Sequence, residues 1–436
     1  MSKIVFYIFT ALYLLIWNVE AQNNYLIPGK GKVYNTPVRI AGLCLAKYAI
    51  FIPDGFPQLR GILVHQHGCG YACNNDWDGN RNGVENDIQY IALAKKWGFA
   101  LISPSLCQIK DSTIKYDRDI DCLGWSNLEN GSEKAFFAAL DTVARWSNHT
   151  EIPNLPIALW GHSGGGNWVL SFMRKHPEKI IALFAVSPAF TYIHDYPKAV
   201  AKIPILIRHG GKADYNDNGI WCWKNALRQF HLIREMGGYV GLAFSPKNEH
   251  GSGDSRYLAI PFFEAVFAQR LPVKGNTILQ DMDTAKAWLA DSTTNQLIKF
   301  SDYKGDKLNM VWLPDSITAA KWKEFVSSGT VTDNTPPPAP YNIKISIMDT
   351  SNIEISWNAD ADIESGIAHF NVYLNDKLIG QLPSEKEYQT FEYGDESVEV
   401  KPIPMKFDLN NIKFKDKAKI EVTTVNRSGL ESMKSK

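Results

Sequence analysis

The sequence predicts an α/β fold with a doubly wound, mostly parallel sheet, followed by a small all-β sandwich. In the first part of the chain, short apolar runs such as residues 157–160 and 203–207 alternate with helix-like segments, as in parallel α/β sheets. A stiff proline-rich stretch at 333–340 interrupts this pattern. Beyond it, runs such as 353–357 alternate apolar and polar residues with a period of two, which indicates antiparallel strands.

The first element is a predicted signal peptide. Lys3 is followed by an apolar core over residues 4–17 and by a small-residue site that ends at Ala21, the pattern of an export signal. The apolar core is too short to cross about 30 Å of hydrocarbon. We therefore expect residues 1–21 to be removed and the mature protein, which starts near Gln22, to be secreted or periplasmic, with no membrane segment after cleavage.

Three larger segments follow the signal peptide. Residues 22–328 are the predicted α/β domain, 329–340 the proline-rich linker and 341–436 the sandwich. A length of 436 residues suits two or three domains. The formal net charge is zero and charged residues make up 21% of the chain, which argues against a nucleic-acid-binding protein and against a polybasic membrane patch.

The chain has six cysteines. Because an exported protein meets an oxidising compartment, we expect disulfides. Cys69 and Cys73 are close enough in sequence to staple one loop. Two further pairings are alternatives among the many that the sequence allows, Cys107 with Cys122 and Cys44 with Cys222.

A candidate nucleophile lies in the pentapeptide at 161–165, Gly-His-Ser-Gly-Gly. An apolar run at 157–160 precedes it and a helix-like segment at 167–176 follows it. A strand, a sharp turn and a helix in this order form a nucleophile elbow, and glycines on both sides of the serine avoid a collision with the adjoining strand and helix. Ser163 is therefore the candidate nucleophile.

The partners of Ser163 are expected in the order serine, acid, histidine along the chain, because the fold imposes this order. The apolar run 203–207 leads into a loop that carries Asp214, the candidate acid, with Asp217 as the alternative. The next apolar run ends in a loop that carries His250, the candidate general base.

Other histidines compete with His250 for the role of base. His162 flanks Ser163 on the turn itself, and His231 falls inside an expected helix over 219–236, so neither is expected to reach the serine. His209 stays open as a competitor.

Donors for an oxyanion are expected at two backbone positions. The strand-like run 61–66 is followed by a glycine-rich turn at 67–70, from which we assign the N–H of Cys69, and the residue after the nucleophile supplies the N–H of Gly164. A metal site is a competing interpretation of four residues here, His65, His67, Cys69 and Cys73. It is disfavoured because the strand has a better role in the oxyanion hole, so we expect no metal and no cofactor.

These motifs resemble those of a known group of enzymes. The His-Gly-Cys-Gly turn at 67–70, the Cys-Leu-Gly-Trp element at 122–125 and the elbow at 161–165 are similar to those of secreted α/β-hydrolases of the polyhydroxybutyrate-depolymerase and feruloyl-esterase kind. The resemblance covers about residues 40–270. It implies an α/β-hydrolase fold and the hydrolysis of carboxylic esters.

The C-terminal segment resembles a fibronectin type III domain over about residues 337–434. The resemblance rests on Trp357 in an early strand, a turn at 365–367 and a closing segment at 426–432. Such modules space or pack against a catalytic domain more often than they bind a ligand, so we expect Trp357 in the core.

The chemistry that the candidate residues support is two-step acyl transfer. His250 takes the proton of Ser163, whose oxygen attacks an ester carbonyl, while Asp214 holds the imidazole. Water then repeats the attack and releases the acyl group.

Aromatic residues near the expected site indicate the substrate class. Four tryptophans fall in loops or at loop–helix junctions on that side of the sheet, Trp77, Trp125, Trp221 and Trp223. Exposed rings there suit sugar rings or a phenolic acyl group, although loop packing explains any one of them as well. We expect a secreted carbohydrate esterase that removes acetyl or feruloyl groups from a plant or algal polysaccharide. A secreted serine peptidase and a catalytically idle polysaccharide-binding scaffold stay open as alternatives.

Overall fold

A computed structural model of the chain describes residues 24–27, 29–40, 44–69, 87–106, 124–189, 193–214, 222–253, 255–272, 278–349, 352–384, 404–410 and 418–435. The predicted signal peptide at 1–21 lies outside these residues. Within the described ranges, no helix has both the length and the apolar character that a membrane span needs.

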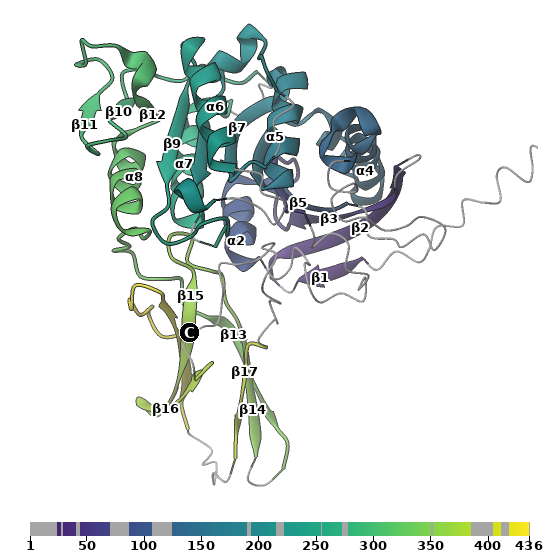
Figure 1. Cartoon of the computed structure of the whole chain (residues 1–436). Coiled ribbons are helices and arrows are strands. Elements are labelled where there is room, and N and C mark those ends of the chain that lie inside the picture. Colours follow the sequence, from purple (N-terminus) through teal and green to yellow (C-terminus); the bar gives the residue numbers. More distant parts are fainter. Residues whose placement is uncertain are drawn as a thin grey trace, which may run out of the picture.

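The larger unit is built on a nine-stranded sheet with the order β1-β2-β3-β5-β4-β6-β7-β8-β9 (Figure 1). From β5 to β9 all neighbouring strands run parallel, while β1, β2 and β3 extend the β5 edge in antiparallel fashion. The predicted doubly wound, mostly parallel sheet is thus confirmed. The strands are β1 Tyr25–Ile27, β2 Gly31–Ile40, β3 Cys44–Pro53, β4 Gly61–Gln66, β5 Phe99–Ser105, β6 Ile157–His162, β7 Ile180–Val186, β8 Ile205–His209 and β9 Val240–Phe244.

Helices cover both faces of this sheet. In the sheet, β5 lies on one side of β4, whereas β6, β7, β8 and β9 follow one another on its other side. Because crossovers between parallel strands are right-handed, the helix α2 that links β4 to β5 lies on the face opposite α4, α5 and α6. Helix α7 shares the face of α2, because the ring of Phe267 lies 5.6 Å from that of Trp97. Strands β6 and β7 are therefore buried along their whole length. The helices are α2 Ile88–Trp97, α4 Ser132–Ser147, α5 Gly164–Lys175, α6 Cys222–Glu235 and α7 Arg256–Arg270.

The segments after α7 cover the outer edge strand β9. Tyr239 stacks on Trp312 with ring centroids 4.9 Å apart, and Trp322 Nε1 donates a hydrogen bond to Leu242 O at 2.8 Å. An uncovered edge would offer its polar groups to another chain. The covering elements are a small antiparallel sheet of β10 Trp288–Ala290, β11 Leu297–Lys299 and β12 Val311–Leu313, and the helix α8 Ser316–Ser328.

Two three-stranded antiparallel sheets form the C-terminal sandwich, with the orders β13-β14-β17 and β16-β15-β18. Trp357 is 4% exposed, and its ring contacts that of Phe370 at 5.3 Å. The prediction that Trp357 is a core residue is confirmed. The strands are β13 Tyr341–Ile347, β14 Ile353–Asn358, β15 Ile367–Leu374, β16 Lys377–Leu382, β17 Lys406–Leu409 and β18 Ile420–Asn426.

The sandwich is docked on α2 of the larger unit (Figure 1). Ala92 of α2 packs within the apolar core of the sandwich. Gln89 Nε2 donates to Ile363 O at 2.9 Å, and Lys95 Nζ pairs with a carboxylate oxygen of Asp360 at 3.2 Å. The two units therefore share apolar and polar contacts.

Asp333 ties the linker into the sandwich. Its Oδ2 accepts hydrogen bonds from Ser365 Oγ at 2.6 Å and from Asn426 Nδ2 at 2.9 Å. The same Asn426 amide donates to Asp362 Oδ2 at 3.1 Å. Burial, assisted by the charge of Asp333, raises the pKa of Asp362 against the hydrogen bonds that it accepts. The start of the linker is thus part of the folded sandwich.

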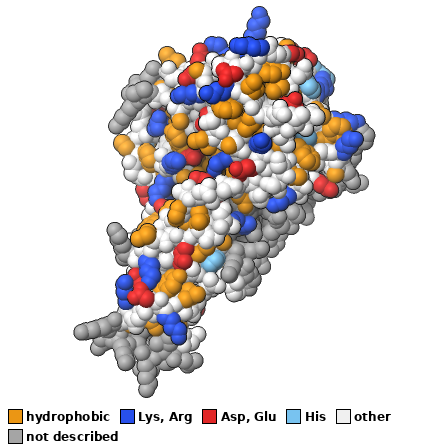
Figure 2. Space-filling model, turned by 90° about the vertical axis from the view of Figure 1, so that its left-hand side faces the viewer, with side chains coloured by type: hydrophobic (Ala, Val, Ile, Leu, Met, Phe, Trp, Pro, Cys, Tyr) orange, Lys and Arg blue, Asp and Glu red, His pale blue; other side chains and the backbone are white. Residues whose placement is uncertain are grey.

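Charged side chains of both signs are interspersed on the face of the molecule that Figure 2 shows. This distribution agrees with the zero net charge of the sequence.

Candidate active site

The serine elbow lies at the carboxyl end of β6, in the centre of the sheet. Ser163 connects β6 to α5 with φ +53°, a left-handed conformation that strains a non-glycine residue. A Cβ on Gly161 would lie 2.4 Å from Gly165 O, and one on Gly165 would lie 2.3 Å from His67 O. The packing around the turn therefore requires both glycines.

Three predicted residues meet at this point although they come from separate strand ends. The Ser163 hydroxyl lies 3.0 Å from His250 Nε2, and His250 Nδ1 lies 2.8 Å from Asp214 Oδ1. Ser163 and Asp214 are buried, whereas the His250 side chain is 18% exposed. The alternative acid, Asp217, lies outside the described residues.

The Asp214 carboxylate is held in its ionised form. Burial alone would raise its pKa, but hydrogen bonds from His250 and from the Gly210 N–H at 3.0 Å, together with the Ser187 hydroxyl, keep the pKa below its ordinary value. An ionised carboxylate can orient the His250 ring with Nδ1 protonated and Nε2 facing the serine.

His162 contributes to the site in a way that the sequence did not indicate. Its side chain is buried, and Nε2 lies 2.8 Å from the backbone oxygen of His250. The Nε2 atom of the His162 ring thus faces the backbone of the His250 loop rather than the hydroxyl of Ser163. His162 thus links β6 to the loop of His250.

The predicted oxyanion loop lies against Ser163. A Cβ on Gly68 would lie 3.1 Å from Ser163 Cβ. Cys69 follows in this loop and packs against the core, and Gly164 is the first residue of α5, where N–H groups have no intrahelical acceptor. Both proposed donors thus belong to segments that adjoin Ser163.

The histidines of this loop region have contacts within the protein. His67 Nδ1 lies 2.6 Å from Gly68 O, and burial lowers the His67 pKa to about 4, so the ring is neutral at pH 7. His65 Nδ1 lies 3.2 Å from Asp87 Oδ2. The Nδ1 atom of each ring is thus engaged within the protein. Cys73 lies outside the described residues.

The prediction that Trp125 offers an exposed ring to the substrate is wrong. This residue is 1% exposed and packs with its ring 5.6 Å from that of His67, so it belongs to the core and cannot present a face to a sugar. Trp223 is half-buried in the first turn of α6, and its backbone N–H donates to Asp214 O at 3.5 Å. Trp77 and Trp221 lie outside the described residues.

Cys222, the first residue of α6, is a buried thiol. The alternative disulfide between Cys44 and Cys222 is therefore wrong. Its sulfur belongs to a group with Asp214 and His250 whose potential ligand atoms all lie within 4.8 Å of one another. Two members of that group are already joined by the hydrogen bond between Asp214 and His250. The other proposed pairings involve cysteines outside the described residues.

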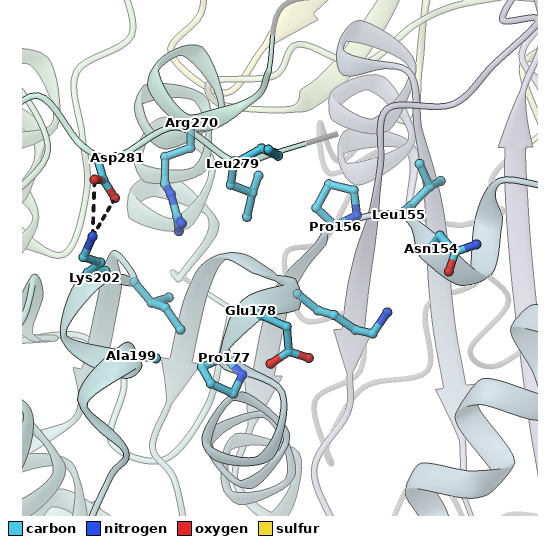
Figure 3. Close-up of a pocket in the computed structure, with 13 residues that line it drawn as sticks. Asn154, Leu155, Pro156, Pro177, Glu178, Ala199, Lys202, Arg270, Leu279 and Asp281 are labelled. Atoms are coloured by element: carbon cyan, nitrogen blue, oxygen red, sulfur yellow. Dashed lines mark hydrogen bonds and ion pairs between the residues drawn. The ribbon is translucent and has the colours of Figure 1, made fainter. Parts of the chain in front are cut away.

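A separate cavity of about 420 Å³ opens at the opposite end of the sheet (Figure 3). Its lining includes Pro156, Pro177 and Ile203, which lie just before the starts of β6, β7 and β8, respectively. It therefore lies at the amino ends of the strands, whereas Ser163 lies at the carboxyl ends. Ligands of open α/β sheets bind at the carboxyl ends.

Several known proteins are similar to parts of this chain. The family model described as serine aminopeptidase, S33, matches residues 132–218. A thermostable esterase is 16% identical, with 49% of this chain and 54% of that chain covered and a TM-score of 0.34; the match thus spans about half of that esterase. S-formylglutathione hydrolase from Agrobacterium tumefaciens is 14% identical, with 53% and 92% covered and a TM-score of 0.36. Dienelactone hydrolase from Anabaena variabilis is 18% identical, with 51% and 88% covered and a TM-score of 0.30. No curated protein matches the sequence.

The strand order and the serine elbow define the larger unit as an α/β-hydrolase fold. The family-model match includes both Ser163 and Asp214, which adds support for a hydrolase.

Proposed function

We propose that the protein is a serine carboxylester hydrolase in which Ser163 is the nucleophile, His250 the general base and Asp214 the residue that orients it. The observation that carries the proposal is the continuous hydrogen-bonded row from Ser163 Oγ through His250 to Asp214, with distances of 3.0 and 2.8 Å. Nucleophile, base and orienting acid within hydrogen-bond reach are what activation of a serine requires.

In the first step, the Ser163 oxygen forms a bond to the ester carbonyl carbon while its proton moves to His250 Nε2. The alcohol of the ester leaves with that proton, and an acyl-serine remains. Water then attacks the acyl carbon, its proton passes through His250 to Ser163, and the acid is released. The Asp214 carboxylate stabilises the imidazolium in both steps.

The backbone N–H groups of Cys69 and Gly164 are our proposed oxyanion donors. Support comes from the loop that carries Cys69, which lies against Ser163, and from the place of Gly164 at the start of α5. Donors fixed before the reaction stabilise the developing negative charge without reorganisation.

We further propose export of the mature protein, a disulfide between Cys69 and Cys73, and a fibronectin type III-like role for the sandwich. The signal-like N-terminus supports export, and export permits the disulfide. The docked sandwich and the buried Trp357 suit a module that packs against a catalytic domain.

The proposed substrates are acetyl or feruloyl esters of plant or algal polysaccharide. Trp223 supports this proposal, because it is only half-buried and its backbone N–H donates a hydrogen bond to Asp214 O. An aromatic face at the rim of the site suits a sugar or a phenolic ring. Trp77 and Trp221 belong to the same proposal.

A serine peptidase is the second candidate, because the matching family model is described as a serine aminopeptidase. It would use the same three residues on an amide. The two candidates differ in whether amide or ester substrates are turned over.

The test is labelling of the purified mature protein with a fluorophosphonate probe, followed by acetyl, feruloyl and aminoacyl chromogenic substrates on the same sample. We expect labelling at Ser163, no labelling of Ser163→Ala, and ester turnover that exceeds amide turnover. Faster amide turnover would favour the peptidase. Folded protein without labelling would leave a binding scaffold as the better interpretation.

A further inference from the structure

The loop that carries His250 contains neither helix nor strand over residues 245–250, yet three consecutive backbone oxygens in it are held by buried side chains. Arg208 Nη2 donates to Asn248 O at 2.9 Å, and Arg208 Nη1 donates to Glu249 O at 3.3 Å. The third oxygen, that of His250 itself, lies 2.8 Å from His162 Nε2. The loop is thus fixed from the strands below it.

Arg208 lies on β8, six residues before Asp214 in sequence, and is fully buried. Its Nη1 also donates to Ser187 Oγ at 3.1 Å. The Ser187 hydroxyl in turn forms a hydrogen bond that lowers the pKa of Asp214. One guanidinium therefore contacts the loop of the base directly and reaches the acid through a single hydroxyl.

The loop of His250 packs very closely against the backbone that follows β8. A Cβ on Gly210 would lie only 1.7 Å from Glu249 O, so the backbone after β8 and the loop of His250 touch without a side chain between them. Ser245 Oγ also accepts the Asn248 N–H at 3.1 Å. With so little free space, a small displacement of the two carbonyls moves His250.

We propose that Arg208 is a positioning residue for catalysis, which sets the place of His250 through the carbonyls of Asn248 and Glu249 and links that loop to Asp214 through Ser187. Arginine suits this task because its planar fork presents several fixed donors at once, whereas lysine offers a point charge on a flexible stem. The inference rests on the proposed function, since it assigns a role around the same three residues.

The test compares Arg208→Met and Arg208→Lys with Arg270→Met. Arg270 is the matched control, because it is also a buried arginine that donates to backbone carbonyls, those of Ile180 and Ile181, but it lies at the far end of the sheet (Figure 3). The rate of fluorophosphonate labelling at Ser163, and kcat and KM for the best ester, are measured after far-UV circular dichroism confirms folding.

We expect Arg208→Met to lower the labelling rate and kcat by about 100-fold, the effect of a displacement of about 1 Å at a reacting group, with little change in KM. Arg208→Lys should recover part of the rate, and it keeps the test decisive if the Met variant does not fold. Arg270→Met should label at the wild-type rate although its unfolding midpoint falls. Equal rates for Arg208→Lys and Arg270→Met would overturn the proposal.

A second readout separates this inference from the proposed function. The NMR resonance of the His250 Nδ1 proton reports its hydrogen bond to Asp214 whether or not the serine reacts. We expect the resonance to shift or broaden in the Arg208 variants and to stay unchanged in Arg270→Met. Wild-type protein that does not label would refute the proposed function alone, while an unchanged resonance in the Arg208 variants would refute the positioning role alone.

Discussion

At the scale of single residues, Asp214 shows how burial and hydrogen bonding compete. It is buried, which favours the neutral acid, but its hydrogen bonds from His250, the Gly210 N–H and Ser187 favour the carboxylate and prevail. The site therefore holds one fixed negative charge next to the imidazole. In the proposed reaction that charge both orients the imidazole and stabilises it when it becomes positive.

Replacement of this carboxylate should affect both turnover and acid stability. We expect Asp214→Asn to lower kcat by about 10⁴-fold, the magnitude known for the corresponding change in a serine protease triad. Because the folded-state pKa is lowered, the carboxylate stabilises the fold above the ordinary value of about 4, and this contribution is lost as pH falls through the lowered pKa.

Thermal unfolding across pH checks the stability part. The difference in Tm between wild type and Asp214→Asn should narrow as the pH is lowered from about 6 to about 3. A difference that is constant over this range would show that the carboxylate's charge does not contribute to stability.

Gly210 gives a second test at the residue scale. Gly210→Ala would place a Cβ 1.7 Å from Glu249 O, so the loop of His250 must move. We expect labelling of Ser163 to slow by about 100-fold or more. Gly241→Ala is the control, because its Cβ would meet Trp312 O at 2.8 Å, away from the serine. Similar labelling rates in the two variants would count against the close seating of the loop.

At the scale of elements, the start of α2 is fixed by a buried ion pair. Asp87 caps the helix and accepts two hydrogen bonds from Arg256 at the start of α7, one of them at 2.8 Å, while its Oδ2 lies 3.2 Å from His65 Nδ1. The guanidinium of Arg256 also lies 4.6 Å from the ring centroid of Tyr90. Burial would raise the pKa of Asp87, but Arg256 and His65 lower it strongly.

Loss of one partner of this pair should be costly. We expect Arg256→Met to lower the free energy of unfolding by about 3–5 kcal/mol, because it leaves a buried carboxylate without its cation. Lys202→Met is the control, since Lys202 and Asp281 form an exposed pair and its loss should change stability by less than about 1 kcal/mol. Urea unfolding gives the free energy of unfolding of both variants, and equal losses of that free energy would contradict the expected difference.

The sequence predicted that Ser163, Asp214 and His250 come together, because each stands at the end of a strand. Arg208 could not be predicted, because one arginine inside an apolar strand gives no sign of a loop 40 residues further on. Trp125 looked like an exposed loop residue, since sequence does not tell to which side a ring turns. The contact between Gln89 and Ile363 joins residues 274 apart, beyond the reach of local patterns.

At the scale of the whole molecule, the docked sandwich predicts cooperative unfolding. Ala92 of α2 lies within the core of the sandwich, and Asn426 holds the linker's Asp333. We expect calorimetry to show one transition for both units, which Asn426→Ala shifts to lower temperature without splitting. Asn352→Ala, which removes a surface-turn contact with Asp349, is the control. Two resolved transitions in the wild type would contradict shared stability.

The wide sequence separation of the meeting residues also sets an order of events in biosynthesis. His250 is made 87 residues after Ser163, and Asn426 is made 93 residues after Asp333. A growing chain can therefore already contain Ser163 while it still lacks His250, the proposed base. The proposed reactivity is thus possible only after His250 has been synthesised. The sandwich can dock on α2 only after its last strands have been synthesised.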